Sequence, residues 1–229
     1  MKTITPYHKD KGDIGVDFAE LYLTTEGKEF KRASKLQDME QGTDCFIDGI
    51  PTDVKNTNDI FICQIMTDTG RVNTRHPFKK KSKATHYCVV NVPIDDASNP
   101  VTKGKFIEHV NIKERLLRDF IKDETNLKAF YKQLQDLENK NMKDFGVSQS
   151  QACFKIKQLI LPFLKPDVGL SYVEPTDADG EISFRLYKSK KKINNEPTNL
   201  DVKSILSKFK TNNANTSPST GENIITINV

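Results

Sequence analysis

Residues 42–55 read GTDCFIDGIPTDVK, and this stretch carries the strongest structural signal in the chain. Apolar, strand-like runs flank the dipeptide Asp48-Gly49, and an Asp-Gly pair between two such runs is a strong signal for a two-residue β-hairpin turn. If these two residues form the turn, the residues on either side of it pair in order along the two strands. The sequence therefore predicts a hairpin in which Asp44 stands opposite Asp53.

The predicted hairpin has one polar and one apolar face, because side chains alternate between the two faces of a strand. Asp44, Asp53 and Lys55 share the polar face. The other face suits a hydrophobic core, and its residues are Cys45, Ile47, Ile50, Thr52 and Val54. Two carboxylates directly opposed destabilise a sheet unless something binds between them. A hard divalent cation such as Mg²⁺, for which Mn²⁺ can substitute, prefers such carboxylate oxygens.

The polar face therefore favours metal-assisted hydrolysis of a phosphodiester. Lys55 could orient or deprotonate a water molecule, or neutralise charge on a phosphate in the transition state. The alternative is simpler, since Asp-Gly hairpins are common and aspartates on an exposed strand face can be solvated without any ligand. From these residues alone, both interpretations stay open.

The same stretch resembles the core signature of the PD-(D/E)XK nuclease superfamily, which includes restriction endonucleases, Holliday-junction resolvases and phage exonucleases. The match consists of Gly42-Thr43-Asp44 followed, across the hairpin, by Asp53-Val54-Lys55, and with its surroundings it covers about residues 13–95. The lead-in from Arg32 to Met39 is similar to that of phage and plasmid members. Thr43 stands where the signature has proline, and Asp53 stands where many members have glutamate.

The resemblance implies a restriction-endonuclease-like α/β fold and a Mg²⁺-dependent nuclease that acts on duplex or branched DNA. It implies that Asp44, Asp53 and the backbone carbonyl of Val54 bind the metal ion, while Lys55 positions the attacking water. Restriction-type and junction-cleaving members often act as dimers, so a homodimer is a candidate assembly. A catalytically inactive nucleic-acid-binding accessory protein of phage type, with the same fold, is the alternative function.

Two further catalytic candidates enter through this resemblance. Superfamily members often carry an acidic residue on the leading helix near the metal ion, which favours Glu20 as a ligand, with Glu40 as the competing candidate. Many members carry a polar or acidic residue on the next strand, where Gln64 could orient Lys55 or contact the substrate backbone. Glu20 and Gln64 are equally compatible with ordinary exposed polar side chains.

A cluster of basic residues follows the strand predicted at 60–66. Its members, which we predict to bind nucleic-acid phosphates, are Arg75, Lys79, Lys80, Lys81 and Lys83. Such contacts raise affinity without reading base sequence, although a solvated lysine-rich loop is the alternative. Phe78, inside this loop, is expected to anchor it rather than to stack on a base. The formal net charge of +4 neither requires nor excludes a nucleic-acid partner.

The hydrophobic pattern predicts one α/β domain over residues 1–188, with a mixed central sheet of four or five strands flanked by helices. The leading helix is expected to start at Asp13 and to stop at Gly27, after a loose polar segment over 1–12. The other expected helices are 111–122, 124–139 and 149–161. The expected strands are 44–47, 50–55, 60–66, 85–92 and 182–188.

Composition bounds the remaining possibilities. No apolar run approaches the roughly 18 residues of a membrane span, and the N-terminus lacks a signal-peptide pattern, so we expect a protein of the bacterial or phage-infected host cytoplasm without a membrane partner. None of the four cysteines lies in a CxxC pair, and we expect them to be buried thiols. Residues 189–229 are expected to form a flexible tail, in which the amphipathic stretch 202–209 could dock on a partner protein.

Overall fold

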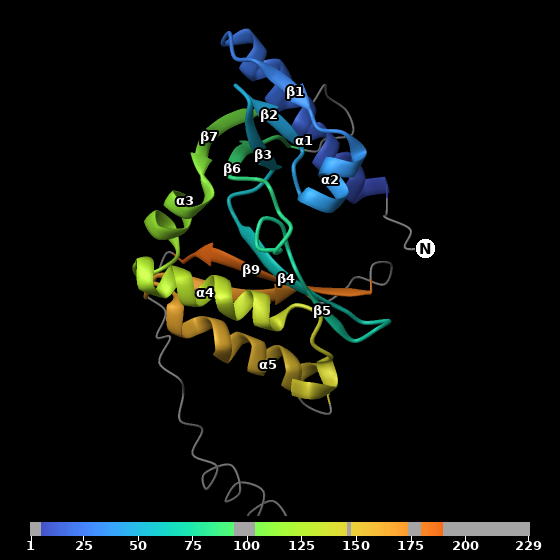
Figure 1. Cartoon of the computed structure of the whole chain (residues 1–229), viewed down its shortest axis with the longest axis vertical. Coiled ribbons are helices and arrows are strands. Elements are labelled where there is room, and N and C mark those ends of the chain that lie inside the picture. The colour runs from blue at the N-terminus through green and yellow to red at the C-terminus, as the bar shows by residue number, and fades with distance from the viewer. Residues whose placement is uncertain (1–5, 94–103, 146–147, 174–179, 190–229) are drawn as a thin grey trace, which may run out of the picture. The chain divides into compact units, whose positions relative to one another are not determined.

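The computed structural model of the chain describes residues 6–93, 104–145, 148–173 and 180–189, which form a mixed α/β fold (Figure 1). They belong to the first of two units into which the chain divides, Met1–Asn195 and Glu196–Val229. The predicted tail beyond Ser189, including the stretch 202–209, lies outside the described residues. The predicted mixed α/β class is confirmed. A second β-sheet accompanies the expected one.

The first sheet has five strands in the spatial order β1-β2-β3-β6-β7. They span Phe30–Arg32, Cys45–Ile47, Ile50–Lys55, His86–Asn91 and Lys105–Asn111. β3 and β6 run parallel, and the other neighbouring strands are antiparallel. One face packs against helix α1 (Pro6–Thr25) through a small apolar core. The buried members of this core include Phe18, Ala19, Leu23, Cys45, Ile47, Cys88 and Val90.

The second sheet has four antiparallel strands in the order β5-β4-β9-β8. They span Arg71–Thr74, Ile60–Met66, Glu181–Lys188 and Val168–Val173. A larger core joins this sheet to three helices, which are α3 (Ile112–Asp119), α4 (Glu124–Leu137) and α5 (Gln149–Ile160) (Figure 1). Two short 3-10 turns, η2 (Met142–Phe145) and η3 (Leu161–Phe163), border these helices in the chain.

Strand β6 separates the two cores and is buried on both faces. Cys88 and Val90 belong to the core beneath α1, whereas Tyr87 and Val89 belong to the larger core. All four side chains are fully buried. A parallel strand covered on both faces reads as a continuous apolar run, which explains the sequence YCVV at its centre.

The predicted hairpin of β2 and β3 is confirmed in its register. Ile47 pairs with Ile50, and Cys45 pairs with Thr52. Asp48 and Gly49 adopt φ angles of 50° and 78°. Positive φ at both central residues defines the type I′ turn, whose twist matches that of the flanking strands.

The predicted start of the first helix was wrong, and several elements were not predicted. Helix α1 begins at Pro6 instead of Asp13, because its first turns are polar and carry no apolar period. The helix predicted over about 111–122 is α3, which begins at Ile112, directly after β7. The elements without a prediction are β1, β5, β7, β8 and the helix α2 (Lys35–Gln41).

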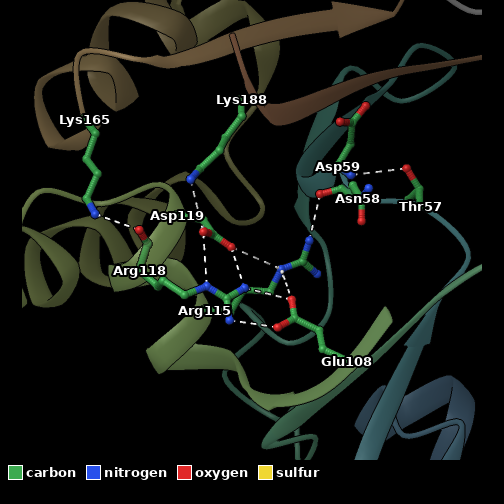
Figure 2. A network of polar contacts seen from close by, with 9 residues as sticks. All are labelled: Thr57, Asn58, Asp59, Glu108, Arg115, Arg118, Asp119, Lys165 and Lys188. Carbon is green, nitrogen blue, oxygen red and sulfur yellow. Dashed lines mark hydrogen bonds and ion pairs between the residues drawn. The ribbon is translucent and has the colours of Figure 1, made fainter. Parts of the chain in front are cut away.

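A network of charged side chains around α3 joins elements of both sheets (Figure 2). The guanidinium of Arg118 donates two hydrogen bonds of 2.8 Å to the carboxylate of Glu108 on β7. It also lies 2.7 Å from Asp119, which forms a second ion pair of 3.2 Å with Lys188 on β9. Through α3, strand β9 of the second sheet is thereby linked to strand β7 of the first.

The four cysteines are buried and free, as predicted. Among the helices of the described residues, none combines the length and the apolar character that crossing a bilayer requires.

Candidate active site

Asp44, Asp53 and Lys55 meet at the end of the β2–β3 hairpin. The ammonium nitrogen of Lys55 lies 2.6 Å from Oδ1 of Asp53. Oδ2 of Asp44 accepts a hydrogen bond of 2.7 Å from the backbone N–H of Val54. Because β2 begins at Cys45, opposite Thr52, it offers that N–H no backbone partner, and the Asp44 side chain takes its place.

Asp53 differs from a solvated surface aspartate, because it is only 2% exposed. Its face of the sheet points toward the larger core and not into open solvent. Burial raises the pKa of Asp53 to about 8; the nearby Lys55 opposes this rise, and the charge of Asp44 adds to it. Its second oxygen, Oδ2, has no hydrogen-bond partner among the described residues. A buried, partly unsatisfied carboxyl costs folding free energy. A positive charge bound at this position would offset that cost.

Tyr87 forms one wall of the site. In the parallel register of β3 and β6, Asp53 stands beside Tyr87, and the ring centre of Tyr87 lies 5.9 Å from the Lys55 ammonium. The ring is fully buried, and its hydroxyl has no hydrogen-bond partner within the described part of the chain. Burial raises the pKa of Tyr87 well above its ordinary value, and Asp53 raises it further, so the phenol stays neutral.

The helix α2 brings a third carboxyl, Asp38, to this site. Asp38 is exposed as a whole residue, but partial burial of its carboxyl raises its pKa, and the adjacent Asp44 raises it further. Ser34 and Gln37 form a reciprocal capping box at the helix start, and Gly42 ends the helix in the left-handed conformation. The pattern Ser-x-x-Gln is a recognised helix-start signature, so the sequence did contain the signal for this helix.

His76 is another residue of the site that the sequence did not reveal. Its ring packs so closely on Gly42 that a Cβ at position 42 would lie 2.3 Å from the ring carbon Cγ. Burial, together with the charges of Lys79 and Lys55, lowers the pKa of His76 to about 4, so the imidazole is neutral. The spacing of the histidines in the sequence did not indicate this role for His76, because Gly42, on which its ring packs, is distant in the chain.

Arg75, a predicted phosphate-binding residue, is restrained by a residue of the second sheet. Its guanidinium lies 3.8 Å from Glu181 on β9, and Glu181 also accepts a hydrogen bond of 3.3 Å from the amide of Gln64 on β4. Burial lowers the pKa of Arg75, whereas Glu181 and Asp53 raise it, so Arg75 is within electrostatic reach of Asp53. Gln64 thus contacts Glu181, a neighbour that was not foreseen.

The predicted basic loop begins beside the site and continues over the end of α2. The backbone N–H of Lys83 donates to the carbonyl of Gln41 at 2.9 Å. Phe78 is fully buried and meets Phe130 edge-on at 5.7 Å, which confirms its role as an anchor. Lys79 is half-buried. The exposed lysines of the loop are Lys80, Lys81 and Lys83.

Glu20 is occupied elsewhere. Its carboxylate accepts hydrogen bonds from Nε of Arg32, at 2.7 Å, and from Nη2 of the same guanidinium. The charge of Asp13, also on α1, does reach the site, since it raises the pKa of Asp38. Glu40 is exposed on α2.

A divalent cation fits this site only with ligands besides side chains. Within the described residues, no group of three His, Cys, Asp or Glu side chains has the geometry to hold a metal ion. Asp44 and Asp53 supply two carboxylates. The carbonyl of Val54 faces the Asp44 side as well, because the N–H and C=O of one strand residue point the same way. Mg²⁺ commonly binds through one or two carboxylates and keeps several waters.

Comparison of the chain with family models, curated proteins and solved structures gives no match.

Proposed function

We propose that the protein is a metal-dependent nuclease that hydrolyses phosphodiester bonds of DNA, with a PD-(D/E)XK-type site at the end of β3. The observation that carries this proposal is that Asp53 is buried with only one of its two oxygens paired. One of its oxygens lies 2.6 Å from the Lys55 ammonium, and the other has no partner in the described part of the chain, although the residue is 2% exposed. A bound cation would satisfy that oxygen and favour the ionised carboxylate.

Asp44 and Asp53 would hold Mg²⁺ or Mn²⁺, with the Val54 carbonyl as a further ligand. When bound, the ion would polarise a phosphoryl oxygen and stabilise the charge that develops on it. Asp44 is fixed in orientation because the Val54 N–H binds one of its oxygens. Asp53 is fixed by burial and by Lys55.

The cations around the carboxylates supply the rest of the chemistry. Lys55 orients the attacking water or neutralises charge on the phosphate. Arg75, restrained by Glu181, is a further cation within electrostatic reach of Asp53. The exposed lysines of the loop bind backbone phosphates further from the scissile bond, which strengthens binding without reading sequence.

The test is cleavage of supercoiled plasmid with Mg²⁺ or Mn²⁺, comparing the wild type with Asp53→Asn and Lys55→Ala. Each substitution should reduce cleavage at least about a hundredfold. Asp48→Asn is the matched control, because Asp48 lies in the same hairpin but pairs with Lys28 at 2.8 Å on the surface. Cleavage that persists in both site variants would reject the site. Absence of cleavage of plasmid, linear, single-stranded and branched DNA and of RNA would reject the activity.

The second candidate is a nucleic-acid-binding protein that keeps the fold without catalysis. The lack of a three-residue metal-ligand group among the described residues favours it. Calorimetric titration with Mg²⁺ separates the two candidates, since a catalytically inactive protein has no requirement for the ion. Heat of binding that disappears in Asp53→Asn would support the nuclease.

We further propose that the protein is cytoplasmic, that it forms a homodimer and that the stretch 202–209 binds a partner protein. A nuclease with buried free cysteines fits the reducing cytoplasm of a bacterium or of its phage-infected host. A homodimer would be seen by analytical ultracentrifugation as a concentration-dependent change in mass. A partner for the stretch 202–209 would be tested by deleting residues 190–229, and unchanged activity and assembly would reject that role.

A further inference from the structure

We propose that Arg115 is a positioning residue for Lys55 and acts through the ring of Tyr87. Its consequence for catalysis rests on the proposed nuclease function, whereas the packing of the three side chains can be tested without it. Arg115 lies on α3, outside the hairpin that carries the site.

The two cations share one aromatic ring. The Lys55 ammonium lies 5.9 Å from the ring centre of Tyr87, and the central guanidinium carbon of Arg115 lies 5.8 Å from it. A cation within about 6 Å of an aromatic ring is attracted by the ring quadrupole, and more strongly when both groups are removed from water. Tyr87 is fully buried, so its ring can be displaced only by repacking the core around it.

Arg115 is itself held in place from several directions (Figure 2). Its guanidinium donates a hydrogen bond of 2.8 Å to the carbonyl of Asn58, ahead of β4. It forms longer ion pairs with Glu108 at 3.5 Å and with Asp119 at 3.9 Å. These partners lie in the loop before β4, on β7 and on α3 itself, and they restrain the guanidinium beside the Tyr87 ring.

Burying the charge of Arg115 costs folding free energy, which a purely structural role does not explain. Arg115 is 3% exposed, and its Nε and Nη1 donate no hydrogen bond to any described residue. Burial accordingly lowers the pKa of Arg115, against the charges of Glu108 and Tyr87. An apolar side chain of similar volume would often serve stability as well or better. The retained charge is explained if it keeps the Tyr87 ring, and with it the Lys55 ammonium, in one position.

Arg118 provides a matched control in the same network. It binds Glu108 and Asp119 at 2.8 Å and 2.7 Å, and its side chain is half exposed. No contact between Arg118 and Tyr87 occurs among the described interactions. Arg115→Met and Arg118→Met therefore both weaken the ion network, but only the first removes the cation against the ring.

The first measurement is the NMR signal of the Lys55 side-chain CH₂ next to the ammonium, identified by its loss in Lys55→Arg. Ring currents of Tyr87 should shift this signal, and Tyr87→Leu should abolish the shift, while Tyr87→Phe should keep it. Arg115→Met should move the signal, whereas Arg118→Met should leave it in place. An unmoved signal in Arg115→Met, or an equal movement in both arginine variants, would overturn the proposal. If Arg115→Met does not fold, Arg115→Gln, which also removes the charge, replaces it, and the same two outcomes decide.

The second measurement is DNA cleavage by the same variants. Arg115→Met should lower kcat between about tenfold and a hundredfold with little change in KM, because small misplacements of a catalytic group have effects of that size. Arg115→Lys should recover part of the loss, and Arg118→Met should stay near the wild-type rate. If the wild type cleaves nothing but the Lys55 signal depends on Arg115, the nuclease function fails and the packing inference stands.

Discussion

Replacing Asp53 by asparagine should change how the stability of the protein depends on pH. Asparagine has almost the same shape as aspartate but cannot ionise. Burial raises the pKa of Asp53 to about 8 in the folded protein, compared with 3.8 for an ordinary aspartate. The folded state therefore holds this proton over a pH range in which the unfolded chain has already released it. Stability from this group is complete below pH 4 and is lost as the pH rises toward 8.

The size of the loss follows from the two pKa values. Each pKa unit corresponds to 1.36 kcal/mol between the two protonation states. Without a bound cation, Asp53 should cost the folded state about 2 kcal/mol at pH 5, about 4 kcal/mol at pH 7 and between about 5 and 6 kcal/mol at pH 9. These values are large beside the total stability of a typical domain, about 5–15 kcal/mol.

The assay is urea unfolding at pH 5, 7 and 9 in EDTA, for the wild type and Asp53→Asn. The difference in unfolding free energy between them should grow in favour of asparagine by about 4 kcal/mol from pH 5 to pH 9. Asp48→Asn should not show this trend, since Lys28 lowers the pKa of Asp48. Saturating Mg²⁺ should stabilise the wild type at pH 9 and leave Asp53→Asn unchanged. Parallel pH profiles in EDTA would refute the argument that burial controls this carboxyl.

Two further predictions concern the surroundings of the site. Gly42→Ala should lower the free energy of unfolding by about 1–3 kcal/mol, because position 42 has a φ of 60° and an added methyl group would collide with His76; an unchanged Tm in thermal unfolding would contradict the contact. Neutralising the exposed loop lysines by Lys80→Gln, Lys81→Gln and Lys83→Gln should reduce the slope of log affinity against log salt for duplex DNA by about 2 to 3. Fluorescence anisotropy without divalent ions measures that slope, and an unaltered value would remove the loop from the nucleic-acid surface.

The hairpin was predictable because its information is local. The Asp48-Gly49 turn and the alternation on either side fix which residues share a face, so Asp44, Asp53 and Lys55 could be grouped from the sequence. The depth of burial of Asp53 was not predictable, since it depends on Tyr87 and on a core built from segments more than a hundred residues away. Local patterns carry no information about such distant packing.

The neighbours of the trio illustrate the same limit. His76 reaches the site only because the loop after β5 crosses the end of α2 at Gly42. Glu20 was favoured by resemblance, but the position of Arg32 in β1 gives it a different partner. Asp38 could have been found, because the capping box formed by Ser34 and Gln37 marks the start of its helix.

The pairing of β4 with β9 has a consequence for how the protein is made. Gln64 and Glu181, which meet across these strands, are 117 residues apart in the chain. The strands of the first sheet are all present once residue 111 has been synthesised, so that sheet and its core with α1 can form early. The second core cannot close until β9 has left the ribosome, and contacts so distant in sequence form slowly. Arg75 therefore acquires its restraint from Glu181 only after β9 has been synthesised. A nascent chain would bring Asp44, Asp53 and Lys55 together before the rest of the site could form around them.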